Sequence, residues 1–198
     1  PKRGVNMSKK IVIADDEPIT RMDIREMLEE AGYVVVGEAS DGFDAIEICK
    51  KHLPNIVIMD IKMPLLDGIN ASKIIIQEGL ADGIILLSAY SDTNFIEKAK
   101  DAGVIGYLVK PLDNKSLIPA VEVAMSKSNE LKEMKNNMIN IEKKLEARKL
   151  IEKAKGILMT QQGISEEEAF SMIRNLSMKK RVTMRDIAGI IIMSKDGI

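Results

Sequence analysis

Cysteine, tryptophan and long apolar runs are scarce or absent in this chain of 198 residues. The single cysteine, Cys49, cannot form a disulfide within the chain, so we expect a reducing, cytoplasmic setting and a buried, unreactive thiol. Aromatic residues make up 3% of the sequence and tryptophan is absent, which predicts an aliphatic core. No apolar run approaches the roughly 18 residues that a membrane-spanning helix needs, so we expect no membrane partner.

Charge is nearly balanced overall, with a formal net charge of −1, but it is unevenly distributed. Residues 1–125 carry 14 basic and 20 acidic side chains, residues 126–149 carry 7 and 4, and residues 150–198 carry 8 and 6. An acidic front and a mildly basic back are consistent with a metal site followed by a part that contacts a polyanion. The basic excess is small, so charge only supplements the motifs.

Short apolar runs and helical segments alternate from Lys10 to about Ser126. The runs show no polar alternation, which is typical of strands buried on both faces of a parallel sheet between helix layers. The pattern therefore predicts an α/β, flavodoxin-like domain with a doubly wound, five-stranded parallel sheet. The expected strands are 10–14, 33–37, 55–59, 83–87 and 105–109, and the expected helices are 18–31, 42–51, 68–78 and 92–100.

Polar side chains follow the ends of four of these runs. Asp15 and Asp16 close the first run, Asp60 the third, Ser88 the fourth, and Lys110 follows the fifth. Ligands bind outside the carboxyl ends of the strands in open α/β sheets, so these groups should converge. Each residue alone is as easily explained as a helix cap, a turn residue or a solvated side chain. Together they predict a pocket for metal-assisted phosphoryl transfer, in which carboxylates hold a hard cation and an ammonium neutralises the transferred group.

Residues 9–125 resemble the receiver domain of response regulators. The resemblance is carried by the acid pair, Met59-Asp60-Ile61-Lys62-Met63-Pro64, Gly68, Leu87-Ser88-Ala89 and Tyr107-Leu108-Val109-Lys110-Pro111. It implies that Asp60 takes a phosphoryl group from the phosphohistidine of a sensor histidine kinase, so that the protein is a phosphoacceptor and not an enzyme. It also implies a Mg²⁺ cofactor, bound directly by Asp16 and Asp60, mostly through water by Asp15, and by the backbone carbonyl of Lys62.

The same resemblance implies how the phosphoryl group is sensed. Lys110 would pair with Asp60 or its phosphate, and Ser88 would donate a hydrogen bond to a phosphate oxygen. Tyr107 would be the aromatic switch that turns inward as Ser88 is drawn to the phosphate. The added charge near −2 and the three acceptor oxygens of a phosphoryl group are a physical reason for nearby donors to reorganise.

A heptad pattern follows the first domain. From residue 117 to about 148 there is no glycine and, after Pro119, no proline, which predicts a long helix. Its apolar residues step by 3, 4, 3 and 4, which favours a parallel coiled-coil dimer over a helix that docks back on its own domain. This seam consists of Leu131, Met134, Met138, Ile141 and Leu145.

The last stretch predicts three short helices, at roughly 150–162, 166–176 and 183–193. Gly163 ends the first, and capping boxes begin the second and third. The expected organisation is therefore a remnant of expression cloning before Met7 (residues 1–6), a receiver (7–125), a coiled-coil linker (126–149) and a three-helix domain (150–198). A DNA-binding tail would need a basic recognition helix, whereas the last helix is mostly Ile and Ala.

Residues ~148–193 resemble the ANTAR module, the RNA-binding domain of transcription antiterminators. The resemblance is carried by Glu152-Lys153-Ala154-Lys155-Gly156-Ile157-Leu158-Met159, Glu168-Ala169-Phe170, Ile173-Arg174, Met178 and Ile187-Ala188. One departure is Ser177, where the family commonly has Ala. Phe170 is expected in the core, which would limit base stacking on the protein.

A glycine inside the first helix of this module indicates a close contact. Gly156 costs about 1 kcal/mol of helix stability relative to Ala, so we expect another backbone nearby, either a neighbouring helix or a nucleic acid. The basic residues around it are either a solvated face or an RNA surface. The candidate RNA-binding residues are Lys153, Lys155, Gly156, Arg174, Lys179, Lys180, Arg181 and Arg185.

These inferences favour a response regulator that dimerises once Asp60 is phosphorylated and binds structured hairpin RNA in a leader transcript to prevent termination. Its expected partners are a histidine kinase, the RNA, a second copy of the chain and RNA polymerase nearby. The alternatives are a DNA-binding response regulator and a receiver whose tail only dimerises or scaffolds.

Overall fold

The computed structural model describes residues 9–89 and 102–196, and the chain divides into two compact units, residues 1–133 and 134–198. The helix predicted at 92–100 lies outside the described residues. Within the described residues, no helix is both long enough and apolar enough to cross a membrane.

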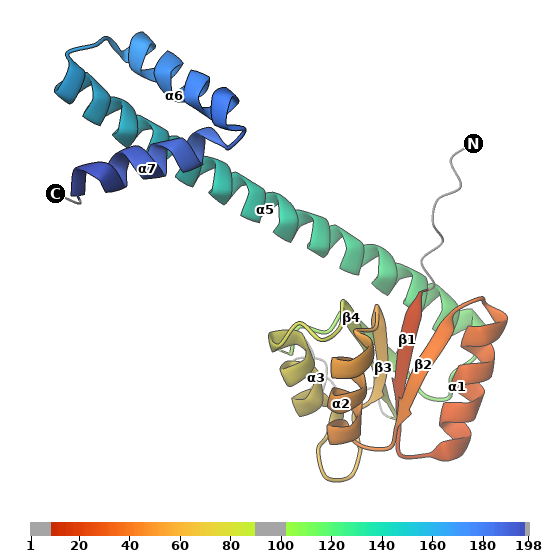
Figure 1. The fold of residues 1–198 in the computed structure, drawn as a ribbon. Helices are drawn as coiled ribbons and strands as arrows, with labels where there is room; N and C mark the ends of the chain where they lie inside the picture. The colour runs from red at the N-terminus through yellow and green to blue at the C-terminus, as the bar shows by residue number, and fades with distance from the viewer. Residues whose placement is uncertain (1–8, 90–101, 197–198) are drawn as a thin grey trace, which may run out of the picture. The chain divides into compact units, whose positions relative to one another are not determined.

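The first unit contains a five-stranded parallel sheet (Figure 1). Its strands lie in the order β2-β1-β3-β4-β5, which confirms the predicted doubly wound α/β fold. Because β1 and β3 are central, the carboxyl ends of the first and third strands meet at one edge of the sheet. The strands are β1 (Lys10–Ala14), β2 (Val34–Ala39), β3 (Ile56–Asp60), β4 (Gly83–Ser88) and β5 (Gly106–Val109).

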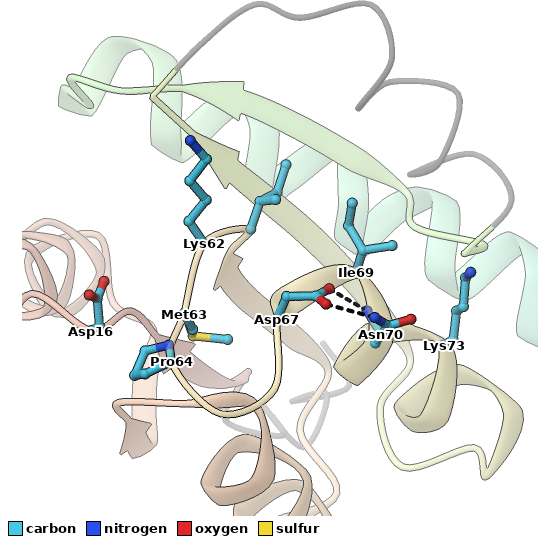
Figure 2. Close-up of a pocket in the computed structure, with 9 residues that line it drawn as sticks. Asp16, Lys62, Met63, Pro64, Asp67, Ile69, Asn70 and Lys73 are labelled. Atoms are coloured by element: carbon cyan, nitrogen blue, oxygen red, sulfur yellow. Dashed lines mark hydrogen bonds between the residues drawn. The ribbon is translucent and has the colours of Figure 1, made fainter.

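Helices follow the strands, and two of them begin with a capping Asp side chain. The side chain of Asp41 accepts hydrogen bonds from the amides of Phe43 and Asp44, and Asp67 accepts one from the Asn70 amide at 2.9 Å (Figure 2). Such side-chain caps satisfy N–H groups that have no partner within the helix. The helices of this unit are α1 (Pro18–Glu30), α2 (Gly42–His52), α3 (Gly68–Gln77) and the beginning of α5 (Asn114–Gln162).

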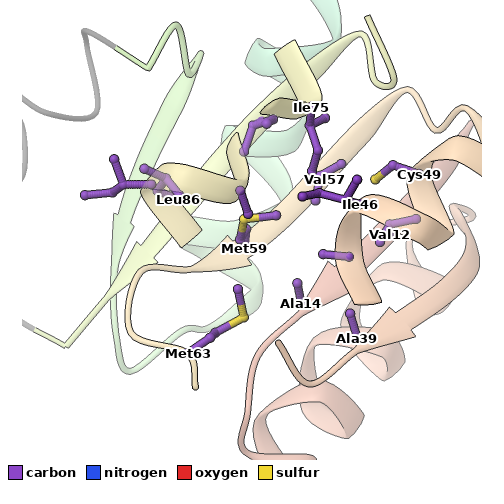
Figure 3. Close-up of a cluster of buried hydrophobic side chains, with 14 of the residues drawn as sticks. Val12, Ala14, Ala39, Ile46, Cys49, Val57, Met59, Met63, Ile75 and Leu86 are labelled. Atoms are coloured by element: carbon purple, nitrogen blue, oxygen red, sulfur yellow. The ribbon is translucent and has the colours of Figure 1, made fainter. Parts of the chain in front are cut away.

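Two aliphatic clusters cover the two faces of the sheet. Val12, Val57 and Met59 pack with α2 and α3 (Figure 3), whereas Ile11 and Ile58 pack with α1 and α5. Successive strand residues point to opposite faces, which is why continuous apolar runs were needed in the sequence. Cys49 belongs to the first cluster, and its burial raises the thiol pKa to about 12, as expected for an unreactive cysteine.

Helix α5 differs from the prediction of a linker helix followed by a separate helix near residue 150. It is one helix of 49 residues from Asn114 to Gln162. Pro119 lies near its start, and between Pro119 and Gly156 the sequence contains neither proline nor glycine, so no residue of that stretch interrupts the backbone hydrogen bonds. It ends before Gly163, which has the positive φ of 65° that glycine adopts readily.

The second unit packs the end of α5 with α6 (Glu166–Lys180) and α7 (Met184–Asp196). Ser165 and Glu168 form the predicted capping box at the start of α6, and Thr183 and Asp186 exchange equivalent hydrogen bonds at the start of α7. The core of this unit consists of Ala154, Ile157, Leu158, Ala169, Ile173, Ile187, Ala188 and Ile192.

Candidate functional site

Three of the predicted groups meet at the carboxyl ends of β1, β3 and β5. The Nζ of Lys110 lies 2.7 Å from Oδ2 of Asp15 and 3.0 Å from Oδ1 of Asp60. Parallel pairing brings these strand ends together although the residues are far apart in sequence. One ammonium therefore bridges two carboxylates that would otherwise repel each other.

Asp15 and Asp16 are adjacent in sequence but differ in exposure. Asp15 is fully buried: its amide donates to the carbonyl of Ala39 at 3.1 Å, and its Oδ1 accepts from the Glu17 amide at 3.0 Å. Its Oδ2 has the ion pair with Lys110 but no well-aligned hydrogen bond. The Asp16 side chain is exposed and lines the pocket above Asp60. The acid pair thus contributes one buried and one accessible carboxylate.

Asp60 is 5% exposed, and burial raises its pKa above the ordinary value. The hydrogen bond and charge of Lys110 and the amide of Lys62, which donates to Oδ2 at 3.0 Å, oppose that rise, whereas Asp15 adds to it. Burial also disfavours the charged form of Lys110, yet the two carboxylates raise its pKa overall. The pair with Lys110 therefore keeps a buried carboxylate available as an oxygen nucleophile.

A cavity of about 400 Å³ opens over Asp60. Ser88 lines it and is buried, while Tyr107 on β5 is half-buried against the α2/α3 side of the sheet. In the part of the chain that the structure describes, no three Asp, Glu, His or Cys side chains form a complete metal cage. Asp16 and Asp60 nevertheless line the same cavity with hard oxygen donors, the type that Mg²⁺ prefers, and Mg²⁺ usually keeps several waters. The donor set therefore fits a partly hydrated magnesium ion.

A second, larger hollow of about 720 Å³ lies beside this cavity (Figure 2). It is bounded by the loop after β3 and the start of α3, and Asp16 and Lys62 line both spaces. The cavity over Asp60 is therefore open to one side.

Gly68 is a residue of the site that the sequence reasoning treated only as part of a motif. A Cβ at this position would collide with the carbonyl oxygen of Asp60, and the Gly68 amide donates to the carbonyl of Ile61 at 3.0 Å. The absence of a side chain thus lets the start of α3 pack closely against the end of β3. The signal in the sequence was a glycine directly after a capping Asp67.

In the second unit, six of the predicted RNA-binding side chains are exposed. Three end α6 or follow it, and Arg181 adopts a left-handed φ of 55° at the helix C-terminus. The hydroxyl of Ser177 donates to the carbonyl of Val182 at 2.6 Å, so the departure from the family pattern lies in this turn. Besides Arg185, which is described below, the exposed residues are Lys153, Arg174, Lys179, Lys180 and Arg181.

Two other basic residues of the predicted set are engaged in ion pairs. Lys155 is 6% exposed, and its Nζ lies 2.6 Å from Glu166 and 2.9 Å from Glu152. The hydrogen bonds from Glu166 and then Glu152 raise the pKa of Lys155. Arg185 is exposed but pairs with Glu146 at 3.3 Å. The geometry therefore favours a role for Lys155 in holding α6 against α5 over the predicted RNA contact.

Gly156 and Phe170 were predicted to lie beside another backbone and in the core, respectively. Apart from its own helix turn, no atom of the described residues lies within 4 Å of a Cβ built at Gly156, so no described neighbouring helix explains the glycine. Phe170 is 42% exposed, so the prediction that it belongs to the core was wrong. Ala169 and Ile173, four residues apart on one face of α6, supply its buried contacts instead. Phe170 lies on a different face and therefore points to solvent.

The seam residues on α5 are exposed along its length. Leu131, Met134, Met138, Ile141 and Leu145 are 49–66% exposed in the single chain. Exposed apolar side chains at heptad spacing on one helix are of the kind that coiled coils bury.

Comparison with known families identifies both parts of the chain. Residues 11–122 match the response regulator receiver domain, and residues 140–192 match the ANTAR domain. The chain belongs to the response regulator family. As a response regulator it is a phosphoacceptor protein and not a classical enzyme.

Relatives of known name are similar over different lengths. The transcriptional regulatory protein PdtaR of Mycobacterium tuberculosis is 43% identical over 184 residues, which cover 93% of this chain and 89% of PdtaR. Chemotaxis protein CheY of Bacillus subtilis is 37% identical over 120 residues, covering 61% of this chain and all of CheY. Both domains of this response regulator are therefore represented in PdtaR, and the receiver alone in CheY.

Solved structures share the receiver fold. The CheY of a CheX–CheY–BeF₃–Mg²⁺ complex from Borrelia burgdorferi superimposes with a TM-score of 0.54 at 28% identity, covering 57% of this chain and 85% of that one. The receiver domain of a NarL regulator from Mycobacterium tuberculosis gives a TM-score of 0.57 at 28% identity, covering 60% and 97%. That complex was solved with Mg²⁺ and BeF₃.

Proposed function

We propose that this chain is a response regulator that accepts a phosphoryl group on Asp60, dimerises along α5 and binds structured leader RNA to prevent transcription termination. The observation that carries the proposal is the joining of two modules by one uninterrupted helix. A pocket with Asp60 and Lys110 in contact lies in the unit before it, and an ANTAR domain lies in the unit at its end. A charge change in the first module can thus alter association of the second.

In the phosphoryl transfer, a carboxylate oxygen of Asp60 attacks phosphorus, the bond to the imidazole nitrogen of a kinase phosphohistidine breaks, and the imidazole leaves. Asp16, Asp60 and the carbonyl of Lys62 would hold Mg²⁺ directly, with Asp15 acting mostly through water. The ion supplies charge neutralisation that lets an anion enter an acidic pocket. Lys110 already contacts Asp60 and would follow the phosphoryl oxygens.

After transfer, the acyl phosphate reorganises donors at the ends of β4 and β5. Ser88 lines the cavity and donates to a phosphate oxygen in this proposal, and Tyr107 turns inward as Ser88 moves. The backbone amide of Lys110 donates to the Ser88 carbonyl at 2.8 Å, so the two strand ends move together.

The RNA surface comprises the exposed basic side chains between residues 153 and 181, namely Lys153, Arg174, Lys179, Lys180 and Arg181, with Arg185 at its margin. Phe170 and Arg174 are one helical turn apart on α6, so an exposed aromatic ring adjoins a guanidinium. Unpaired RNA bases stack on such groups, and phosphates pair with the surrounding cations. Exposed Gly156 leaves room for a backbone.

A two-fold protein suits a leader with two hairpins, because each subunit would hold one RNA element and the second contact is intramolecular. The antiterminator form of the RNA would then be favoured over the terminator, with RNA polymerase nearby on the same transcript. On α7, Ile187, Ala188 and Ile192 are buried in the core, which leaves few side chains for a DNA groove.

The decisive experiment is filter binding of the phosphorylated protein to labelled two-hairpin RNA and to duplex DNA of equal length. We expect RNA binding to increase when a small phosphodonor and Mg²⁺ are added. We expect Asp60→Asn to abolish this increase, because the variant cannot be phosphorylated. Preference for duplex DNA would support the DNA-binding alternative, and absence of binding to both would support a scaffold.

The surface is tested by the quadruple variant Arg174/Lys179/Lys180/Arg181→Ala at physiological salt. Its control is Lys127/Lys132/Lys135/Lys143→Ala, which removes equal charge from α5 outside the proposed surface. We expect the first variant to lose most of its RNA affinity and to lower the salt slope by about 0.7–0.9 for each lost phosphate contact. Equal affinity of the two variants would contradict the surface.

A further inference from the structure

Arg21, in the second turn of α1, contacts the main chain of the acid pair. Its Nη1 donates to the carbonyl oxygen of Asp15 at 2.6 Å, and its Nε lies 3.2 Å from Oε2 of Glu38. The Arg21 side chain is 17% exposed, so the contact is largely shielded from solvent. Glu38 at the end of β2 is held in turn by Nε of Arg25 at 2.5 Å.

Arg21 holds the carbonyl oxygen of Asp15, which none of the other contacts of Asp15 described above involves. The Asp15 amide is bonded to Ala39, Oδ1 to the Glu17 amide, and Oδ2 is paired with Lys110. The remaining polar atom of Asp15 is its carbonyl oxygen. Because a peptide unit is planar, fixing this oxygen also fixes the plane that contains the nitrogen and Cα of Asp16.

We infer that Arg21 is a positioning residue for the metal site: it sets the direction in which the exposed Asp16 carboxylate enters the pocket. The inference depends on the proposed magnesium site at Asp16 and Asp60. Arg21 does not touch the ion. It acts through the Asp15–Asp16 peptide, and the Glu38 carboxylate pairs with the same planar guanidinium.

Positioning and simple electrostatics predict opposite results. A cation near an acidic pocket weakens Mg²⁺ binding through repulsion, so deletion of the Arg21 charge alone would tighten Mg²⁺ binding. Loss of the carbonyl contact would instead free the Asp15–Asp16 peptide and weaken Mg²⁺ binding. Supporting contacts of metal ligands are typically worth about 10–100-fold in metal affinity.

The test is calorimetric titration of the full chain with MgCl₂ for the wild type, Arg21→Ala, Arg21→Lys and Arg25→Ala. We expect about tenfold weaker Mg²⁺ binding in Arg21→Ala. Arg21→Lys keeps the charge but lacks the fork that spans Asp15 and Glu38, so we also expect weaker binding there. Arg25→Ala loses a contact to the same Glu38 but none to Asp15, and should stay within about twofold of wild type.

Thermal unfolding without Mg²⁺ separates folding from positioning. Similar unfolding temperatures for Arg21→Lys and Arg25→Ala, with weak Mg²⁺ binding only in the former, would support the inference. Unchanged or tighter Mg²⁺ binding in both Arg21 variants would overturn it while leaving the metal site intact. A wild type that binds no Mg²⁺, or an Asp16→Ala variant that binds it normally, would overturn the metal site itself.

Discussion

At the scale of single residues, burial and charged partners move two carboxyl pKa values in opposite directions. Burial raises the pKa of Asp60, and its hydrogen bonds only partly offset that effect. Burial would also raise the pKa of Glu38, but the hydrogen bonds and charges of Arg25 and Arg21 lower it below its ordinary value. The difference follows from the number of cationic donors: Glu38 has two guanidinium partners, whereas Lys110 is shared between two carboxylates.

The lowered pKa of Glu38 predicts a pH-dependent contribution to stability. Its ion pairs stabilise the fold fully above the ordinary pKa of 4.5 and lose this effect as the pH falls through the depressed folded value. We expect Glu38→Gln to lower the free energy of unfolding by roughly 1 kcal/mol at pH 7, because the partners are partly exposed. Urea unfolding of both proteins between pH 7 and pH 3 should show the difference shrinking below pH 4.5. A constant difference over this range would contradict the prediction.

At the scale of elements, α5 contains apolar residues that are buried near its two ends and apolar residues that are exposed in its middle. Leu117 and Val121 are buried on the receiver sheet, and Ala154 and Leu158 are buried in the second unit. Between them, the seam residues are exposed, and the positions between the seam residues are polar except for Ile139. The middle of the helix therefore has an apolar stripe available for a second copy of the chain.

We predict that Met138→Lys with Ile141→Lys keeps the phosphorylated protein monomeric in analytical ultracentrifugation. The two ammonium groups would be placed in the seam, where desolvating them is costly. Asn136→Lys with Asn140→Lys is the matched control, because it adds the same charge to exposed positions outside the seam. Phosphorylation of Asp60 should be equal in both variants. A dimer that survives the seam substitutions would place the interface in the receiver or in the ANTAR domain.

At the scale of the whole molecule, the proposed output depends on two RNA contacts being made at once. Linking two binding events can raise the overall affinity by about 10²–10⁴-fold without any new contact. The size of this gain depends on dimerisation and not on the RNA surface of one subunit. Affinity for a paired target and affinity for a single hairpin should therefore respond differently to the same substitution.

We predict that the seam variant binds a single hairpin as well as the phosphorylated wild type does, but loses about 10²-fold or more for the two-hairpin RNA. Filter binding with both RNAs at one salt concentration measures this directly. Equal losses for both RNAs would indicate that the substitutions disturb the RNA surface itself. Undiminished binding to the paired RNA would rule out avidity along α5.

Tertiary structure corrected the sequence-based view where side-chain direction depends on a neighbouring element. Lys155 and Phe170 were assigned to the surface and the core, and the structure reverses both. Composition gave no warning, because a lysine can be buried between Glu152 and Glu166 once α6 folds back on α5. The position of Ala169 and Ile173 in the core then turns Phe170 to solvent.

The sequence alone was sufficient for the fold of the receiver and for the order of its chemical groups. Apolar runs without alternation require a sheet covered on both faces, and in a parallel sheet the residues after each run reach a common edge. Only the tertiary structure decided the contacts between those groups. Asp15 and Asp60 share Lys110, Gly68 packs against the end of β3, and Arg21 donates a hydrogen bond to the Asp15 carbonyl. Such contacts depend on how segments that are distant in sequence pack against each other, which local patterns of polarity do not encode.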